Sequence, residues 1–343
     1  MGGVAVRERP VVSVCIANYN GSAIIASCIE SVLAQDCDFP VEILVHDDAS
    51  TDGSAELVAQ DYPNVRLIRS GTNVGFCIAN NRMVVQAEGA YILLLNNDAE
   101  LHLDALRVLH DQAERLGGQA ILSLPQYDFL TGELIDRGCL LDPFFNPVPN
   151  LDPSRSDVAM VIGACLWTSR KLWKELGGFP KWFDSIAEDM YLCCRARLAG
   201  HPVRVLPVSG YLHWQGRTFG GNRVSGGRLD TTFRRRSLSE RNKTFVMFLA
   251  CPAPLFFLVS PLHFVLVLLE GLLVSALKWD IAVWKTIYAP IFPALWRVKK
   301  KLFLLRGDIQ RARVISLMDW LAVFVVLPYK MVMLIKHGLP EIR

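Results

Sequence analysis

The chain has 343 residues, of which 52% are apolar and 20% charged, with a formal net charge of +3 and a mean hydropathy of +0.28. This length corresponds to one large domain or two, because domains usually hold about 100–200 residues. The apolar share excludes a disordered, collagen-like or mucin-like chain. A positive mean hydropathy is high for a soluble enzyme, so we expect contact with a membrane.

Charge is unevenly distributed along the chain. Residues 1–227 hold 18 Lys or Arg and 26 Asp or Glu, whereas residues 228–343 hold 18 and 7. We expect an acidic first part that holds metal and performs chemistry, and a basic, apolar second part that lies on anionic lipid. The nine cysteines form no CxxC pair, and their number is odd. This pattern favours reduced thiols in a cytosolic protein over disulfides or a zinc site, and the N-terminus lacks the apolar segment of a signal peptide.

The first hundred residues alternate between predicted strands and predicted helices. The strands are expected over 11–17, 41–45, 65–69 and 91–95, and the helices over 22–35 with Ser22 as N-cap, 54–61 and 76–87. The strands are apolar runs without alternation, which indicates a parallel sheet covered on both faces. Three of them end in polar residues: Asn18-Tyr19-Asn20, Asp47-Asp48 and Asn96-Asn97-Asp98. Because ligands bind outside the carboxyl ends of such strands, these clusters predict one site.

The middle of the chain is predicted to be less regular. Residues 125–160 are rich in Pro, Asp and Asn, and we expect loops there. Helices are predicted near 169–176 and 188–199, with a strand over 201–208. A glycine-rich stretch and the basic cluster Arg234-Arg235-Arg236 follow.

The last hundred residues have a different pattern. Residues 244–269 contain no Asp, Glu, Lys or Arg, a length that could span a bilayer. Prolines are expected to interrupt this segment at Pro252, Pro254 and Pro261, which leaves 262–269 too short to span. Beyond it, aromatic residues alternate with Lys and Arg: Trp279, Trp284, Tyr288, Trp296 and Trp320. This pattern favours helices lying in the membrane interface, with a true span or a buried helical subdomain as alternatives.

The polar clusters point to metal and nucleotide binding, although each has a structural alternative. Asp98 follows a buried strand, where a carboxylate would be costly unless it held a divalent cation; it could instead cap a helix around 103–113. Asp47 and Asp48 could accept bonds from a base N–H and a ribose hydroxyl, or serve the turn that follows them. Asp52 and Gly53 are assigned to that turn and the next helix start.

Two further candidates lie in the second half of the first part. Glu188-Asp189 opens a predicted helix, where acids suit the helix dipole, but one of them could also be a general base. The loop with Trp182 just before them could hold an acceptor. His213 could ligate metal or contact a diphosphate, or be an ordinary structural histidine.

Taken in order, these segments resemble the family-2 inverting glycosyltransferases. The ordered set is NYN, VHDDASTDG, NVGF with NN, LLLNND, GGF, ED and HWQG, and the resemblance covers residues 11 to about 245. The tail, with Arg241-Asn242 leading into apolar helices and a basic KKKLFLLRGDIQRAR stretch, is similar to the bacterial rhamnosyltransferase-type branch. Enzymes of that branch assemble O-antigen, cell-wall or capsular glycans on lipid carriers.

The resemblance implies an α/β fold of the GT-A type, a Rossmann-like nucleotide-sugar transferase domain over 1–243. Its nucleotide-sugar half would cover about 10–120 and its acceptor half 121–243, and residues 244–343 would form a helical membrane-associating region. The resemblance places the following residues at the nucleotide-sugar: Ala17, Asn18, Asn20, Asp47, Asp48, Asn73, Gly75, Asn80 and Asn97. It places Asp189 as catalytic base with Glu188 beside it, Trp182 and Gly163 at the acceptor, and Asp98 and His213 at a Mg²⁺ or Mn²⁺ ion.

The sequence departs from the family pattern at two positions. Asn96 replaces the first acid of the D-x-D motif, which removes a charge and weakens the expected metal affinity. Tyr191 stands where a second Asp often follows ED, which puts an acceptor role there in doubt. No Q-x-x-R-W motif follows His213, which argues for transfer of one or a few sugars rather than processive synthesis.

The implied reaction is a single displacement from a nucleotide-sugar, dTDP-rhamnose or a UDP-hexose, to a hydroxyl of a polyprenyl-linked glycan acceptor. The implied location is the cytoplasmic face of a bacterial inner membrane, and no nucleic-acid partner is expected. Three alternatives are a non-catalytic glycan-binding scaffold, a polyprenyl-phosphate sugar transferase and a dinucleotide-dependent oxidoreductase. The last lacks the expected G-x-G-x-x-G after the first strand.

Overall fold

The computed structural model describes residues 8–214, 221–225 and 227–343. Within the first hundred residues the predicted alternation is confirmed. The strands are β1 (Val12–Asn18), β2 (Val41–Asp47), β3 (Arg66–Arg69) and β4 (Tyr91–Asn96), and the helices between them are α1 (Ile25–Leu33), α2 (Ser54–Asp61) and α3 (Phe76–Gln86).

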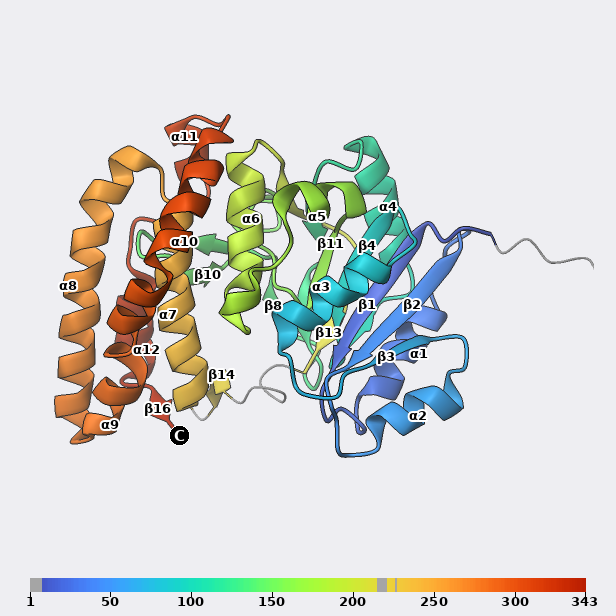
Figure 1. Cartoon of the computed structure of the whole chain (residues 1–343), viewed down its shortest axis with the longest axis horizontal. Helices are drawn as coiled ribbons and strands as arrows, with labels where there is room; N and C mark the ends of the chain where they lie inside the picture. Colours follow the sequence, from blue (N-terminus) through green and yellow to red (C-terminus); the bar gives the residue numbers. More distant parts are fainter. Residues whose placement is uncertain (1–7, 215–220, 226) are drawn as a thin grey trace, which may run out of the picture.

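A seven-stranded sheet forms the centre of residues 8–214, hereafter the sheet domain (Figure 1). Its strand order is β12-β6-β11-β4-β1-β2-β3, with β6 (Ile121–Ser123), β11 (Cys165–Ser169) and β12 (Val203–Val205) supplied by later segments. Strands β4, β1, β2 and β3 run parallel, as predicted, whereas β11 lies antiparallel to both β4 and β6. The α/β class is therefore confirmed, with a mixed sheet.

Both faces of this sheet are covered by helices, and the alternation of side chains along each strand serves both. Val12, Val14 and Ile16 of β1 pack with α1 and α4 (Ala105–Arg115). Cys15 points to the other face, into the cluster that includes α3 and α6 (Glu188–Leu198). Successive strand residues point to opposite faces, so a strand buried on both sides is apolar throughout. The short α5 (Arg170–Leu176) also contacts β11.

The prediction of loops over 125–160 is confirmed for most of this segment but missed four short strands. A second sheet has the order β5-β13-β7-β8 and is built from β5 (Ala99–Leu101), β7 (Gln126–Asp128), β8 (Leu134–Asp136) and β13 (Tyr211–His213). The pair β9 (Cys139–Leu141) and β10 (Pro147–Pro149) lies beside it. Strands of three residues carry too few positions for a periodicity to be read from the sequence.

The predicted start of the first helix is also wrong. Helix α1 begins at Ile25, and its N-cap residue Ile24 makes no side-chain capping bond. Ser22 instead lies in the preceding turn, where its backbone N–H donates to Asp52 Oδ2 at 2.8 Å. The N–H groups of Ile24 and Ile25 both donate to the carbonyl of Gly21, so the turn that leads into the helix begins before Ser22.

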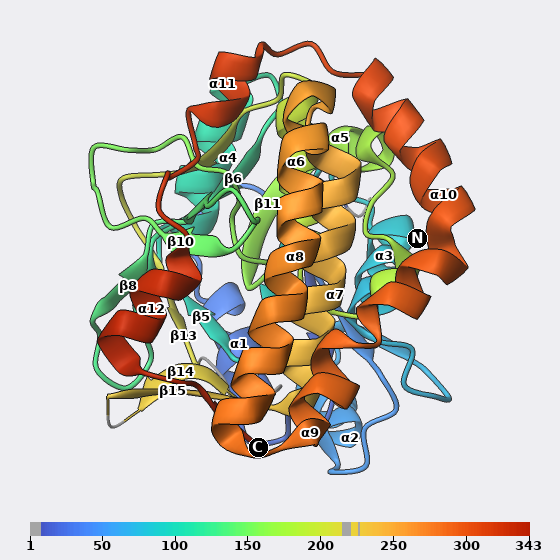
Figure 2. The ribbon, with the colours of Figure 1, turned by 90° about the vertical axis from the view of Figure 1, so that its left-hand side faces the viewer.

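Helices dominate the rest of the chain and lie together on one side of the sheet domain (Figures 1 and 2). They are α7 (Phe233–Ala250), α8 (Ala253–Lys278), α9 (Ile281–Val283), the π-helical turn η2 (Trp284–Tyr288), α10 (Ile291–Arg311), α11 (Leu317–Leu321) and α12 (Tyr329–His337). A small sheet of β14 (Gly221–Ser225), β15 (Arg228–Thr231) and β16 (Glu341–Ile342) joins the start and end of this region. The rest of the glycine-rich stretch, 215–220 and 226, lies outside the described residues.

The prolines do not interrupt α8, contrary to expectation. Pro252 is the N-cap residue, Pro254 lies in the first turn, and Pro261 is accommodated inside one continuous helix of 26 residues. The first turn tolerates proline because its N–H groups have no partner within the helix. Among the described residues α8 is the one helix long and apolar enough to cross a membrane, and 28% of its most apolar stretch is buried in the protein.

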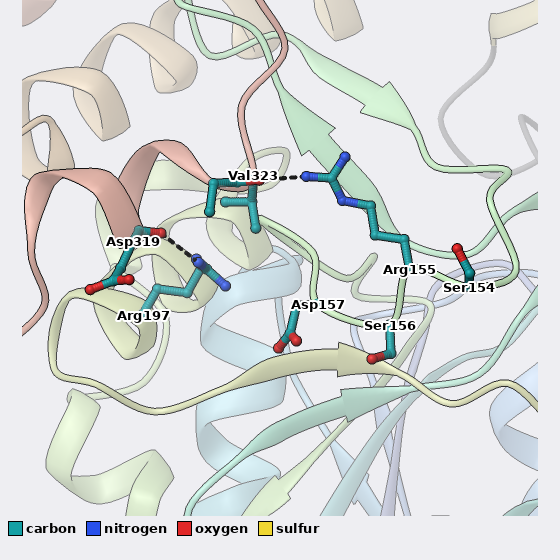
Figure 3. A pocket seen from close by; sticks show the side chains of 8 residues that line it. Ser154, Arg155, Ser156, Asp157, Arg197, Asp319 and Val323 are labelled. Atoms are coloured by element: carbon teal, nitrogen blue, oxygen red, sulfur yellow. Dashed lines mark hydrogen bonds between the residues drawn. The ribbon is translucent and has the colours of Figure 1, made fainter.

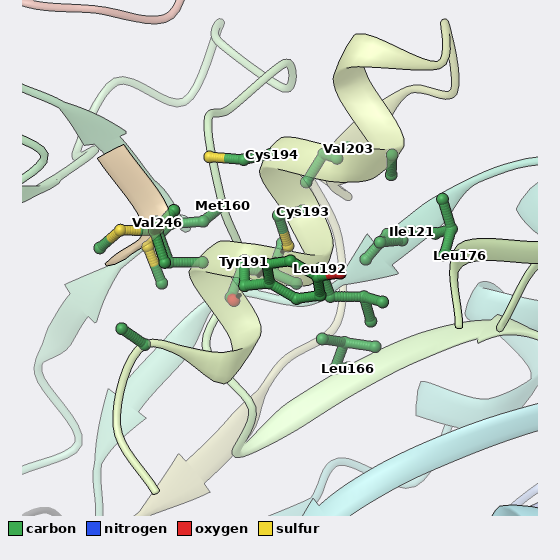
Figure 4. Close-up of a cluster of buried hydrophobic side chains, with 14 of the residues drawn as sticks. Ile121, Met160, Leu166, Leu176, Tyr191, Leu192, Cys193, Cys194, Val203 and Val246 are labelled. Carbon is green, nitrogen blue, oxygen red and sulfur yellow. Dashed lines mark hydrogen bonds between the residues drawn. The ribbon is translucent and has the colours of Figure 1, made fainter. Parts of the chain in front are cut away.

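Helix α7 connects the C-terminal helices to the sheet domain. It runs without a break across residue 243, the predicted domain boundary, and buries Phe245 and Val246. Figure 4 shows Val246 in the same apolar cluster as Tyr191 and Cys193 of α6. Further along, Trp320 and Tyr288 are each 1% exposed and so are core residues, contrary to the prediction of an interfacial role. Trp279 and Trp296, in contrast, are exposed.

Candidate functional site

The three polar clusters predicted at strand ends lie together at one edge of the central sheet. In the parallel register Asn18 is paired with Asp47, and Ala17 with both His46 and Asn96. Asn97 Nδ2 donates to Asn18 Oδ1 at 2.8 Å, and Asn18 Nδ2 donates to Asp47 Oδ1 at 3.2 Å. A chain of side-chain hydrogen bonds therefore crosses from β4 through β1 to β2.

Gly21 is required for the close approach of these asparagines, a role that the sequence analysis missed. A Cβ at this position would lie 2.3 Å from Asn18 Oδ1 and 2.4 Å from Asn97 Nδ2, where no side chain fits. The glycine that follows the NYN segment was the available signal. Gly21 thus allows the β1–α1 turn to pass directly over the asparagine pair.

Asp47 and Asp48 organise the neighbouring loops, as the turn interpretation proposed, and both are nearly buried. Asp47 Oδ2 accepts from the backbone N–H of Ser50 at 3.1 Å. The two oxygens of Asp48 accept from the N–H groups of Val74 at 2.7 Å and Gly75 at 2.9 Å. Asp48 therefore holds the 73–75 segment against the end of β2, and any contact with base or ribose would use the remaining lone pairs.

The other residues predicted at the nucleotide-sugar have different environments. Asn20 has a φ of 51° and accepts from the N–H of Thr51 at 2.8 Å, so it braces the turn after β2. Asn73 is exposed beside Gly75. Asn80 is fully buried and donates to the carbonyl of Phe76 in its own helix at 2.9 Å, so its amide group faces protein. Donor contacts by these residues stay predictions.

Asp98 lies in the turn between β4 and β5, and the alternative that it caps a helix is wrong. Helix α4 begins at Ala105 with Asp104 as its N-cap residue. The Asp98 carboxylate is buried and its Oδ1 lies 3.1 Å from His213 Nε2, which arrives from β13. Asn96 Nδ2 lies 3.5 Å from the same nitrogen. Two sheets thus bring Asn96, Asp98 and His213 together across more than a hundred residues of chain.

These three side chains fit a divalent cation. Asn96 Oδ1 is buried, and the described part of the chain offers it no hydrogen-bond partner. An unpaired amide oxygen, a carboxylate and an imidazole are ligands that such cations accept. Within 8–214, 221–225 and 227–343 no three His, Cys, Asp or Glu side chains gather as a complete metal site. These three side chains supply only part of a coordination shell, so a cation held here would need further ligands from outside the described residues.

Glu188 and Asp189 open α6 and are both buried. Asp189 Oδ2 accepts from the N–H of Gly163 at 3.0 Å, and its Oδ1 accepts from its neighbour Met190 at 2.7 Å. The next residue, Ala164, accepts from the N–H of Asn96 at 3.0 Å. Residues 163–164 therefore bridge the acid pair and the cation ligands. Gly163, predicted at the acceptor, is placed as a backbone donor to Asp189.

The two acids have different electrostatic environments. Burial raises the pKa of Asp189, while the N–H groups of Gly163 and Met190 stabilise its anion and oppose that rise. Burial and the charge of Asp189 hold the pKa of Glu188 well above its usual range. Glu188 Oε2 has no hydrogen-bond partner among the described residues. The backbone donors thus favour the charged form of Asp189, whereas the environment of Glu188 disfavours its charged form.

Trp182 and Tyr191, the second position at which the sequence departs from the family pattern, lie near the helices of the tail. The Trp182 ring packs against Phe183 and Phe245, and Lys301 Nζ of α10 lies 5.2 Å from its centroid. Tyr191 is buried, and its hydroxyl accepts from Arg195 at 3.0 Å, so it serves the core. Trp182 is the member of this group that keeps partial exposure at the acceptor half.

A cavity of about 370 Å³ lies elsewhere, between the 154–157 loop, the end of α6 and α11. Figure 3 shows the side chains of Arg155 and Arg197 extending from the sheet domain toward α11 and the segment after it. Arg197 Nη2 donates to the carbonyl of Asp319 at 3.2 Å, and Arg155 donates to that of Ala322. None of the predicted site residues lines this cavity, which marks the seam with the tail. A smaller space of about 80 Å³ lies beside Asp98 and Trp214.

Comparison with known proteins agrees with this fold. The sequence model of Glycosyl transferase family 2 matches residues 13–177, from β1 to the end of α5. A mycobacterial relative, N-acetylglucosaminyl-diphospho-decaprenol L-rhamnosyltransferase of Mycobacterium tuberculosis, is 29% identical over 220 residues, covering 54% of this chain and 70% of the relative. Succinoglycan biosynthesis protein ExoO of Rhizobium meliloti is 37% identical over 120 residues, covering 35% of this chain but only 34% of its own length.

A solved structure is similar over most of the chain. The mannosyltransferase PcManGT from Pyrobaculum calidifontis, in complex with GDP-Man and Mn²⁺, superposes with a TM-score of 0.51 at 18% identity, covering 89% of this chain and 86% of that one. At this identity the likeness establishes the fold, a GT-A-like α/β domain. Together with the family match and the relatives, it leads to one conclusion: residues 13–177 form a glycosyl transferase family 2 domain.

Proposed function

We propose that the protein is a metal-dependent, inverting glycosyltransferase that moves a sugar from a nucleotide-sugar to a hydroxyl of a lipid-linked glycan acceptor. The observation that carries this proposal is the link between the acid pair and the cation ligands. Asp189 is held by Gly163, and the adjacent Ala164 binds Asn96. A base and a site for phosphate charge are thus tied to the same two-residue segment.

Asp189 is the general base of this reaction. It takes the proton from the acceptor hydroxyl, and that oxygen attacks the anomeric carbon as the bond to the nucleoside diphosphate breaks on the opposite face. One carboxylate base is enough for a single displacement, and the anomeric configuration inverts. Burial raises the pKa of Asp189, which strengthens it as a proton acceptor, and the two N–H donors fix its orientation.

Asn96, Asp98 and His213 would hold the cation, Mg²⁺ or Mn²⁺. The cation would neutralise charge on the departing diphosphate, so that no protein acid is needed at the leaving group. The mannosyltransferase of similar fold forms a complex with GDP-Man and Mn²⁺, which supports a divalent cation and a nucleotide-sugar here. The rhamnosyltransferase relative favours dTDP-rhamnose as donor, with UDP-hexoses next.

The acceptor is a polyprenyl-linked glycan, and the chain works at a membrane surface during assembly of a surface polysaccharide. The relatives' names support this class of product and acceptor. The tail supports the membrane contact through large exposed apolar side chains on helices that lie side by side in Figure 2. They include Leu258, Leu262, Leu269 and Leu273 of α8, Trp296, Phe303 and Leu304 of α10, and Met331, Leu334 and Ile335 of α12.

Exposed basic side chains accompany this apolar face, as an anionic membrane surface would require. Lys285, Arg297 and Lys300 are exposed on η2 and α10. Exposed apolar patches of this extent are rare in soluble monomers, and flanking cations attract acidic lipid headgroups. We place the protein on the cytoplasmic face of a bacterial inner membrane, where nucleotide-sugars are available.

The deciding experiment measures release of nucleoside diphosphate from a panel of nucleotide-sugars, with and without Mn²⁺ or Mg²⁺, in the presence of a polyprenyl diphosphate-linked sugar. We expect turnover with one donor, dependence on the cation, and a product with inverted anomeric configuration by NMR. Retention of configuration, or turnover unaffected by EDTA, would contradict the proposed mechanism. A lack of release from every donor would favour the non-catalytic alternative.

A further inference from the structure

The loop that delivers the acid pair has an unusual backbone. This loop, residues 183–187, hereafter the base loop, ends directly before Glu188. Three of its residues that are not glycine have left-handed φ angles: Asp184 at 65°, Ile186 at 70° and Ala187 at 67°. A residue with a Cβ avoids this region, and a β-branched residue such as Ile186 avoids it most strongly. The base loop therefore needs outside contacts to keep its shape.

Asn242 of α7 supplies such contacts. Its side-chain Nδ2 lies 2.9 Å from the carbonyl of Phe183, 2.9 Å from that of Ser185 and 2.8 Å from that of Ile186. Asn242 is completely buried. A single amide group thus gathers three carbonyls of the base loop at one point.

The neighbouring residue fixes which way the amide points. Arg241 Nε donates to Asn242 Oδ1 at 2.9 Å, and because arginine has no acceptor, that atom must be the oxygen. Arg241 Nη2 also donates to the carbonyl of Phe183 at 3.0 Å. Oxygen and nitrogen of the Asn242 amide are therefore both committed, and a residue without the NH₂ group cannot replace it.

The base loop also contacts the donor side of the site. The carbonyl of Asp184 accepts from the N–H of Cys77 at 3.0 Å, at the start of α3. Gly75, whose N–H binds Asp48, lies just before that helix. A shift of the base loop would therefore change the distance between the acid pair and the donor.

Helix α7 is itself firmly anchored, so it can act as a rigid support. Glu240 Oε2 accepts from Lys243 Nζ at 2.7 Å, and its Oε1 lies 2.7 Å from Lys330 Nζ of α12. Lys243 also donates to Asn146 at 2.7 Å. With about 100° between successive helix residues, Asn242 projects from a different side of α7 than Glu240 and Lys243. One side of α7 is thus bound to the tail and another to the base loop.

We propose that Asn242 is a positioning residue for catalysis, which holds the base loop in its left-handed conformation and so sets Asp189 at the distance that proton transfer requires. This inference rests on the proposed function, because it assigns Asp189 the role of base. Asn242 does not touch substrate; it acts through the three carbonyls. Loss of its amide N–H donors lets the base loop relax and displaces Asp189, whereas the donor contacts of β1, β2 and β4 are unchanged.

The test compares Asn242→Asp and Asn242→Ser with a matched control, Asn150→Asp. Asn242→Asp keeps the size of the side chain but replaces its donors with an anion, and Asn242→Ser keeps one hydroxyl donor. Asn150 is also buried, and its Nδ2 donates to the carbonyls of Arg137 at 3.3 Å and Arg155 at 2.9 Å. The control therefore removes the same chemistry from a loop that does not carry the acid pair.

We expect kcat to fall about 100-fold in Asn242→Asp, because a misplacement of about 1 Å can cost this much. The KM for the nucleotide-sugar should stay within about twofold of the wild type. The kcat of Asn242→Ser should lie between that of the wild type and that of Asn242→Asp. Asn150→Asp should lower the thermal midpoint but leave kcat within about twofold. Equal kcat values in Asn242→Asp and Asn150→Asp would overturn the inference.

Hydrogen exchange gives a second readout that does not need turnover. Peptides covering residues 183–190 should exchange faster in both Asn242 variants than in the wild type, and unchanged in Asn150→Asp. Unchanged exchange of these peptides in Asn242→Ser would refute the proposed role of Asn242 even if Asn242→Asp did not fold. A wild-type protein that releases no nucleoside diphosphate would refute the proposed function. Faster exchange in the variants would still establish that Asn242 holds the base loop.

Discussion

The strand ends of the central sheet and the C-terminal helices place their unusual residues in opposite ways. In the first, polar side chains such as Asn18, Asp47 and Asp98 are buried at strand ends, bonded to one another or to loop backbone. In the second, apolar side chains such as Leu258 and Leu273 are exposed on a helix surface. Buried polar groups and exposed apolar groups both carry a free-energy cost, so both mark places where a binding partner is expected.

The comparison also separates what holds each region together. The strand ends are fixed by a dense set of short hydrogen bonds, whereas the tail is joined to the rest through α7 and a buried ionic cluster, Arg236, Glu240, Lys243, Glu270 and Lys330. Damage to the first should reduce chemistry and damage to the second should reduce stability. The following predictions test that division, beginning with the largest effect.

Asp189→Asn should lower kcat by about 10³-fold or more, because the amide cannot accept the acceptor proton. Binding of the nucleotide-sugar, measured by calorimetry, should be retained, since Asp189 lies on the acceptor side of the cation ligands. Asp157→Asn is the matched control, because Asp157 is an exposed acid paired with Arg204 at 3.0 Å. Turnover of Asp189→Asn close to that of the control would exclude Asp189 as base.

Glu240→Gln should lower the free energy of unfolding by about 3–5 kcal/mol, because it leaves the buried ammonium of Lys243 without its anion. Urea unfolding followed by circular dichroism measures this loss. Glu56→Gln is the control: Glu56 pairs with Arg69 at 2.7 Å on the surface, where solvent screens the interaction and its loss should have little effect. Similar losses in both variants would contradict the structural role assigned to the ionic cluster.

Leu258→Ser combined with Leu269→Ser should weaken binding to anionic vesicles by about 30-fold, since two half-exposed leucines contribute about 2 kcal/mol on burial. The residues lie three turns apart on one side of α8. The control pair, Leu103→Ser with Leu130→Ser, alters two leucines of the sheet domain that are each 65% exposed. Vesicle cosedimentation should distinguish the two pairs, and equal binding would remove the tail from the proposed membrane contact.

Gly21→Ala should raise the KM for the nucleotide-sugar by about tenfold, because the new Cβ would push Asn18 and Asn97 apart. A factor of ten corresponds to about 1.4 kcal/mol of binding. Gly71→Ala is a suitable control, since nothing lies within 4 Å of its added Cβ. An unchanged KM in Gly21→Ala would show that the asparagine pair does not contribute to donor binding.

The smallest effect concerns pH. Burial raises the pKa of Asp189, and only its unprotonated form accepts a proton. The value of kcat should therefore begin to fall, as pH is lowered, above the range of an ordinary aspartate at about 3.9. A pH profile of kcat at saturating substrate measures this limb. A profile that stays flat down to pH 4 would contradict the burial of the base in the working enzyme.

The match between sequence and structure was closest where a pattern is local. The order of strands and helices through β4 followed from apolar runs, and the convergence of three polar clusters followed from the parallel sheet. The short strands over 126–149 were missed because three residues give no periodicity, and Ser22 was misassigned because the turn into α1 begins at Gly21. The continuity of α8 was missed because Pro254 lies in a first turn that tolerates proline.

The sequence by itself determined the α/β class, the polar strand ends and the uneven distribution of charge and apolar residues, since each depends on neighbours in the chain. Only the tertiary structure decided which groups meet: Asn96 and Asp98 with His213, Gly163 with Asp189, and Asn242 with the base loop. These contacts join residues tens to more than a hundred positions apart. Local propensity carries no information about such pairs, because packing of separate elements alone brings them within hydrogen-bonding distance.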